Sequence, residues 1–194
     1  MAMQGGQDGE ALLELGISLH PEHDLARHRL MTVLASRLGY ASVVVPRECA
    51  NADELAVDLR SVAAGTVVEV DDPTDVHVVR AAHLDAIRVA RATLDAAGDT
   101  RRVVVAVPVA IGRTTNEAAA RASRDSRFVG DQHPELSGIF GTFEQAQRQV
   151  IEIAGAGGGA LRVTLADDPD IADLMAQVRA LVVGPTVVLH RQGP

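Results

Sequence analysis

The chain has 194 residues and is 47% hydrophobic, with 26 acidic residues, 18 basic residues and a net charge of −8. A chain of this length buries one sizeable core, and the acidic balance excludes the cationic surface with which most nucleic-acid binders neutralise phosphates. Every basic residue is an arginine, which also excludes Schiff-base chemistry and the lysine of a Walker A phosphate loop. We therefore expect one domain with no nucleic-acid partner.

The compartment is indicated by what the sequence lacks. Its single cysteine, Cys49, cannot form an internal disulfide, and no Cys/His spacing resembles a zinc site. The first ten residues, MAMQGGQDGE, have neither the basic start nor the apolar centre of a signal peptide, and no apolar run approaches the ~18 residues of a membrane span. These features predict a cytoplasmic protein with no membrane association and no bound metal.

Apolar strands alternate with helical segments along the chain. Strands are predicted at 15–19 (LGISL), 41–46 (ASVVVP), 66–70 (TVVEV), 103–109 (VVVAVPV), 160–165 (ALRVTL) and 186–190 (TVVLH). Helices are predicted at 25–38, 52–64, 75–97, 114–127, 142–154 and 170–182. The alternation predicts a single α/β domain over 15–194, with about six mostly parallel strands, preceded by a flexible segment over 1–14.

A glycine cluster at 155–159, AGAGGGA with its flanking residues, raises the question of a phosphate-binding loop. Such loops follow a strand and lead into a helix, because the phosphate needs the free N–H groups of the helix N-terminus. Here the predicted helix comes first and the strand follows. We therefore interpret the cluster as a helix-to-strand turn, in which Gly155 and Gly157 adopt left-handed conformations.

Residues 141–165, GTFEQAQRQVIEIAGAGGGALRVTL, resemble the C-terminal unit of the luciferase-like monooxygenases. In that family a Gly-Thr-Pro-Glu-Gln start is followed by a helix, an Ala-Gly-rich turn and the last barrel strand. Gly141, Thr142, Glu144 and Gln145 match this start, although the proline is replaced. Thr142 also suits the N-cap of a helix with an acidic first turn.

Residues 15–48 and 105–122 are similar to two other parts of the same family, its first strand–helix–strand unit and its penultimate strand entering a helix. The resemblance implies a (β/α)8 barrel that binds FMN or a deazaflavin, and a protein that pairs as a homodimer. A barrel of this type needs at least ~200 residues, and only one more strand fits between 41–46 and 103–109. We therefore expect a shortened, TIM-barrel-like member that lacks its middle units and has weak or no flavin binding.

Strand ends are where barrel enzymes carry their chemistry. The first strand is followed by His20, His23 and Asp24, which suit acid–base work near neutral pH or, alternatively, an exposed loop with Asp24 as helix cap. The second strand is followed by Glu48, which matches an acidic position of the family, and by Cys49, which stands where members often carry a histidine. His20 and Glu48 are the catalytic candidates, and no cofactor-binding residue can be assigned.

Two acidic clusters follow later strands. Carboxylates suit hard cations, but Asp-rich runs also cap helices and form turns, and we favour caps. The members of these clusters are Asp71, Asp72 and Asp75, and Asp167, Asp168 and Asp170.

Two functions fit these patterns. One is a flavin-dependent (FMN or deazaflavin) oxidoreductase or monooxygenase with a degenerate cofactor site, and the other is a non-catalytic luciferase-like scaffold for binding or assembly. Only 2% of residues are aromatic, so few side chains can stack on an isoalloxazine ring, which favours the scaffold on mechanistic grounds. Valine-rich edge strands predict a homodimer, with 186–190 packed along a sheet edge, and a small-molecule ligand is compatible with either function.

Overall fold

The computed structural model describes residues 12–72, 74, 77–80, 82–128, 134–165 and 168–183. Its strands are β1 (Glu14–Ser18), β2 (Ser42–Val45), β3 (Val67–Val70), β4 (Val78–Val79), β5 (Val103–Gly112), β6 (Ile139–Thr142) and β7 (Gly158–Leu165). Its helices are α1 (Leu25–Arg37), α2 (Ala52–Arg60), α3 (Leu84–Ala96), α4 (Thr115–Ala122), α5 (Pro134–Ser137), α6 (Phe143–Gly155) and α7 (Ile171–Val182).

All seven strands join one sheet in the order β3-β2-β1-β7-β5-β4, with β6 paired to β5 beside this path. Every pairing is parallel, as expected when helices connect successive strands. The end strands β3 and β4 are not paired with each other, so the sheet stays open. The fold is thus an incomplete β/α barrel, as predicted from the missing middle units.

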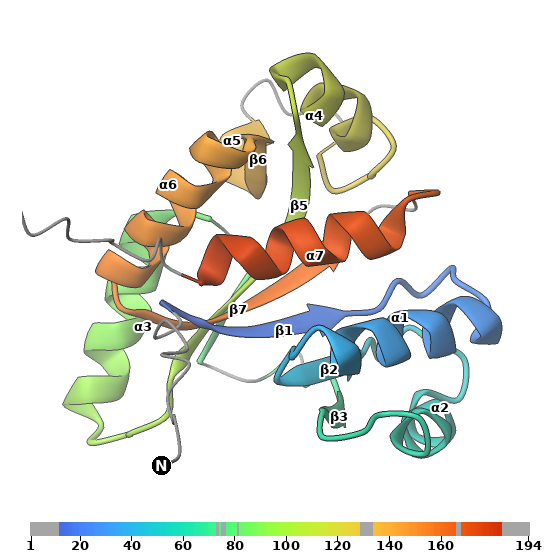
Figure 1. The fold of residues 1–194 in the computed structure, drawn as a ribbon. Helices are drawn as coiled ribbons and strands as arrows, with labels where there is room; N and C mark the ends of the chain where they lie inside the picture. Colours follow the sequence, from blue (N-terminus) through green and yellow to red (C-terminus); the bar gives the residue numbers. More distant parts are fainter. Residues whose placement is uncertain are drawn as a thin grey trace, which may run out of the picture.

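The two faces of the sheet differ in chemistry because successive side chains of a strand point to opposite faces. On β1, Leu15 and Ile17 belong to the hydrophobic core, whereas Gly16 and Ser18 line open hollows on the other face. Figure 1 looks onto the helix-covered face, with α7 lying across β1 and β7. Burying one large apolar side chain such as Ile17 contributes about 1.5–3 kcal/mol, so the helix-covered face supplies most of the stability.

The region between β3 and β5 departs from the prediction. A helix over 75–97 was expected, but α3 begins at Leu84, and the pair Val78–Val79 forms β4 beside Val104 and Val105. Two β-branched residues gain backbone hydrogen bonds from the neighbouring strand, which outweighs their place in a helical pattern. The gap between the second strand and β5 therefore holds two strands, where one was predicted.

Other boundaries also differ. The helices predicted over 52–64 and 114–127 end earlier, at Arg60 and Ala122. The stretch expected to be a loop before 142 contains α5 and β6, and β6 pairs with the extended end of β5. The strand predicted at 186–190 and the segment 1–11 lie outside the described residues.

The N-cap residues predicted from the sequence mark the starts of two helices correctly. Asp24 caps α1, its carboxylate accepting from the Arg27 N–H at 2.7 Å. Thr142 caps α6 in a capping box with Gln145, as the predicted N-cap requires. In the glycine cluster Gly157 has φ +100°, whereas Gly155 is the last residue of α6, so the left-handed conformation predicted for Gly155 is wrong.

Within the described ranges, the structure has no helix that is both long and apolar enough to span a membrane.

Candidate functional site

The inner face of the open sheet is a trough lined by small and polar side chains. Gly16 of β1 lies opposite Ser42 of β2, and a Cβ at this glycine would approach the Ser42 Oγ to 2.4 Å. Ser18 and Thr164 face the same side on β1 and β7. These small residues leave room above the neighbouring strands for one long side chain, that of Arg162.

Arg162 reaches from β7 to the far edge of the sheet. Its Nη1 donates to Asp71 Oδ1 at 2.8 Å and its Nη2 to Glu69 Oε1 at 3.0 Å, and its side chain is 12% exposed. Arg80, which follows β4, donates to the other oxygen of Asp71 at 3.0 Å. Because Asp71 follows β3, these ion pairs connect the two unpaired edges of the open sheet.

A hollow of about 490 Å³ lies at the carboxyl ends of the strands, the position at which β/α barrels bind their ligands. We call it the carboxyl-end hollow. Its volume falls within the range of small-molecule sites, roughly 300–1,000 Å³. Its polar lining is cationic in composition, with three arginines and one carboxylate. The residues that line it include Ser18, Asp71, Arg80, His83, Ala106, Pro108, Arg127, Ser137, Arg162 and Thr164.

The arginines of the carboxyl-end hollow are held by carboxylates but keep spare donors. Arg127 gives its Nε to Asp125 Oδ1 at 2.7 Å and its Nη2 to the other carboxylate oxygen. Arg80 bonds through Nη2 alone. Among the described residues no acceptor bonds Nη1 of Arg127 or Nε of Arg80. A guanidinium oriented in this way suits a phosphate or carboxylate ligand.

His83 also faces the carboxyl-end hollow. It occupies the N-cap position of α3, but its side chain makes no capping hydrogen bond. His83 is exposed, and histidine is the residue type of this lining that general acid–base chemistry uses most often.

His20, one of the two predicted catalytic residues, lies beside this hollow and not in its lining. It lines a neighbouring hollow of about 340 Å³ together with Glu22, His23, Arg124 and Arg127, as well as Asp125 and Ser126. The rings of His20 and His23 lie 5.3 Å apart. We call this the histidine hollow, and it adjoins the carboxyl-end hollow because Arg127 lines both.

Glu48, the second predicted catalytic residue, is exposed on the turn after β2 and belongs to neither of these two linings. The next residue, Cys49, is buried. Burial, and then the charge of Glu48, raise the pKa of the Cys49 thiol. A raised pKa makes the thiolate scarce at neutral pH, which agrees with a structural Cys49.

The described acidic residues after β3 and β7 form turn hydrogen bonds and ion pairs, whereas helix caps were predicted. Asp72 accepts from the Thr74 N–H at 2.9 Å, and Asp168 accepts from the Asp170 N–H at 2.9 Å and from Arg121 Nε at 3.0 Å. Asp170 takes the N-cap position of α7 without a side-chain cap bond. No group of metal-ligating side chains forms among the described residues, and residues 75 and 167 lie outside them.

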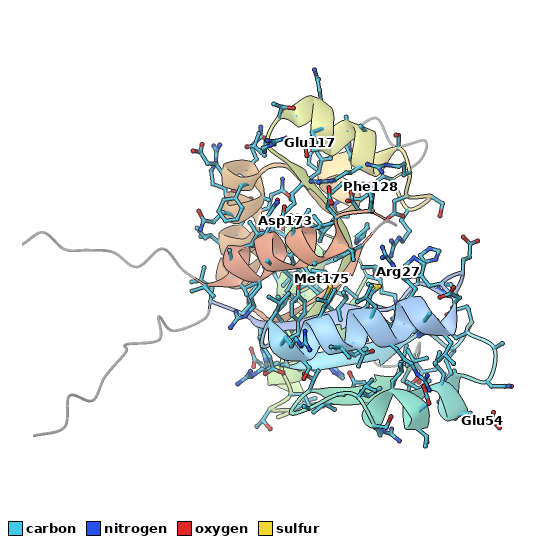
Figure 2. The ribbon with its side chains drawn as sticks, turned by 45° about the vertical axis from the view of Figure 1, so that its right-hand side comes forward. Arg27, Glu54, Glu117, Phe128, Asp173 and Met175 are labelled. Carbon is cyan, nitrogen blue, oxygen red and sulfur yellow. The ribbon has the colours of Figure 1, made fainter. Side chains whose placement is uncertain are left out.

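Charged groups gather at the amino ends of α1 and α7. Arg27 donates to the backbone oxygen of Asp168 at 2.9 Å, and Figure 2 shows it at the amino end of α1 on the side of α7. Burial by itself would raise the pKa of Asp168. The hydrogen bond from the Asp170 N–H and the guanidinium groups of Arg121 and Arg124 together outweigh that effect, so the pKa of Asp168 is lowered. Asp168 is therefore an ionised anchor for the helices that border the hollows.

The residues that define the carboxyl-end hollow were missed by sequence reasoning. Arg80 was assigned to the interior of a predicted helix, and Arg127 to the end of another. Arg162 did carry a signal, because it interrupts the apolar run of a strand and alternates with Leu161 and Val163, which are buried. A charged residue on one face of such a strand indicates a polar interior on that side.

No family model and no curated protein matches the chain. Among solved structures, that of apo-MsnO8 matches with a TM-score of 0.60 and 12% sequence identity, covering 88% of this chain and 96% of that one. An identity this low establishes likeness of fold alone. The comparison therefore agrees with the incomplete β/α architecture, and the ligand has to be inferred from the site.

Proposed function

We propose that the protein is a shortened luciferase-like, flavin- or deazaflavin-dependent oxidoreductase that binds a phosphate-bearing cofactor weakly in the carboxyl-end hollow. The observation that carries this proposal is the placement of Arg80, Arg127 and Arg162 around one hollow at the strand ends. The spare guanidinium donors suit the cofactor phosphate, and Ser18 and Thr164 offer hydroxyl groups for its polyol chain.

The rest of the lining has room for a flavin ring but offers it few stabilising contacts. Ala106 and Pro108 of β5 form an apolar wall against which a ring face can lie. Within the described residues, no Phe or Tyr lines the hollow, so the ring gains little stacking energy. The fit is thus good for the phosphate and loose for the ring, and we expect affinity in the micromolar range or weaker.

When bound, the flavin would supply the redox chemistry, while the protein binds and orients it. Of the described residues, His83 lines the hollow and would be the group to hold or move a proton there. His20 and Glu48, the candidates from the sequence, have no place in that lining.

A non-catalytic binding scaffold is the second candidate. It is favoured because side chains of the protein itself occupy the trough. Arg162 with its two carboxylate partners occupies the interior of the open barrel, where a deeper cofactor would otherwise extend. In that case the carboxyl-end hollow would bind an anionic ligand without redox turnover.

Flavin titration separates these candidates. Calorimetry and flavin fluorescence with FMN and with a deazaflavin should show one weak site per chain, weakened by Arg80→Gln and unchanged by Arg88→Gln. Arg88 is a matched control because it is exposed and pairs with Asp85 at 2.7 Å on α3. Binding of phosphate but of no flavin would support the scaffold and contradict the oxidoreductase.

A homodimer is also proposed, with the interface at the helices beside the open edges of the sheet. Val57 of α2, Val67 of β3 and Val89 of α3 are each more than half exposed, at 63%, 61% and 65%. The free edge of β3 is itself partly covered, since Arg60 Nε donates to the Val68 carbonyl at 3.2 Å, which blunts edge pairing. The interface would therefore use the apolar side chains more than the strand backbone.

Light scattering tests the dimer. We expect twice the 20.4 kDa chain mass at micromolar concentration, reduced toward the monomer by Val57→Glu. Deletion of 186–194 should promote aggregation if that segment covers an edge. A soluble monomer in the intact and truncated proteins would contradict both expectations.

A further inference from the structure

We infer that the histidine hollow is a second oxyanion site, which takes a phosphate or carboxylate group through Arg127, Arg124 and His20. The site adjoins the proposed cofactor hollow and shares Arg127 with it, but it does not require a bound flavin. The bound group could come from two sources. It is either a free anion or the second anionic group of a ligand that lies in the carboxyl-end hollow and extends past Arg127 into the histidine hollow.

The first support is the fixed orientation of Arg127. Asp125, whose side chain is 2% exposed, holds it by the two parallel hydrogen bonds of a bidentate pair. Such a pair consumes Nε and one N–H of Nη2 and leaves the remaining guanidinium N–H groups on the opposite side. The spare donors are therefore held in place before any ligand arrives, which lowers the entropy lost on binding.

The second support is the tautomer of His20. The backbone N–H of Glu22 donates to His20 Nδ1 at 3.3 Å, so this nitrogen acts as the acceptor. In a neutral imidazole the other nitrogen, Nε2, then carries the proton. Because His20 lines the hollow, its Nε2–H can serve as a donor to an oxyanion there.

The third support is Arg124, on the same wall as Arg127. Its Nε donates to the Ala120 carbonyl at 3.2 Å, and its Nη2 lies 3.8 Å from Asp168 Oδ2. Asp168 has a shorter bond to Arg121, so Arg124 can turn toward a ligand without leaving that carboxylate unpaired. Among the described residues, no acceptor bonds its Nη1.

The charges that face the hollow are consistent with an anionic occupant. Asp125 is neutralised by its bidentate arginine, and Glu22 is exposed at the rim. The pairing also neutralises Arg127, so Arg124 is the remaining cation of the lining, and recognition of an oxyanion rests on the oriented N–H groups of Arg127 and Arg124. An oxyanion would meet N–H donors that are already oriented, whereas a cation would have to compete with Arg127 for the Asp125 carboxylate.

The test is a titration of the full chain with inorganic phosphate, followed by long-range ¹H–¹⁵N spectra of the histidine rings. We expect a saturable shift of the His20 Nε2 resonance with one phosphate per chain. Arg124→Gln and His20→Phe should each weaken binding roughly tenfold, and Arg88→Gln should not. Thermal melts establish that each variant is folded.

A second arm identifies the source of the anion. Phosphate that still binds at its original affinity in Arg80→Gln, or beside bound FMN, indicates an independent anion site. If FMN displaces the phosphate, a single ligand occupies both hollows and contacts Arg127 from both of them. An unshifted His20 resonance, or equal affinity in Arg124→Gln and the native chain, would overturn the inference, whatever the outcome of the flavin titration.

Discussion

Replacing Arg162 with methionine tests whether the ion pairs across the trough hold the open sheet together. Methionine has a similar length but removes both hydrogen bonds, which are 2.8 Å to Asp71 and 3.0 Å to Glu69. The Arg162 side chain is 12% exposed, so the change leaves two carboxylates without this partner in a partly enclosed space.

The magnitude follows from what each carboxylate retains. Breaking a fully buried ion pair costs about 3–5 kcal/mol, but Glu69 is 46% exposed and regains water. Asp71 keeps its bond to Arg80. Solvent screening therefore reduces the expected loss of unfolding free energy to about 2 kcal/mol, or a melting temperature lower by about 4–8 °C.

Urea denaturation of Arg162→Met and of the control Arg88→Met measures this difference, because urea is uncharged and does not screen the ion pairs. In the control pair both side chains, Arg88 and Asp85, are exposed. Loss of this pair should lower the unfolding free energy by less than about 1 kcal/mol. A double-mutant cycle with Glu69→Gln isolates the coupling of one pair. Equal stabilities of the two arginine variants would refute the role assigned to the trough.

Two further predictions concern single residues. Asp168 has a lowered pKa in the folded state, so its stabilisation is complete above the unfolded pKa of about 4 and is lost as the pH falls through the folded value. Asp168→Asn should remove that part of the acid dependence of the unfolding free energy, measured by urea unfolding as the pH falls below about 4. An unchanged pH dependence would contradict the role of Asp168 as an ionised anchor. Cys49→Ala should leave the fold and any activity nearly unchanged, and Cys49 should react more slowly with a disulfide reagent than free cysteine does, since burial raises its pKa. Loss of activity at an unchanged melting temperature would give Cys49 a functional role.

The sequence predicted those features that depend on neighbouring residues. Strand–helix alternation gave the parallel α/β fold, and the caps at Asp24 and Thr142 are local chemistry that a single side chain determines. The order of helix and strand also identified the glycine cluster as a turn. These inferences needed no knowledge of which strands pair.

The features that depend on distant residues were out of reach. β4 is two residues long and exists because β5 lies beside it, and no window of sequence contains that pairing. Arg162 meets Asp71 across 91 positions, so the trough appears only once the sheet is assembled. The catalytic candidates were chosen from strand ends alone, and the sequence could not tell which strand ends share one hollow.

The most direct test of the central claim is calorimetric titration of the native chain with FMN, repeated with Arg80→Gln and Arg88→Gln. We expect one site per chain with a dissociation constant in the micromolar range or weaker. Arg80→Gln should weaken the binding further, and Arg88→Gln should leave it unchanged. Absence of saturable binding at millimolar FMN, or sub-micromolar affinity that ignores Arg80, would contradict a loose flavin site at the carboxyl-end hollow.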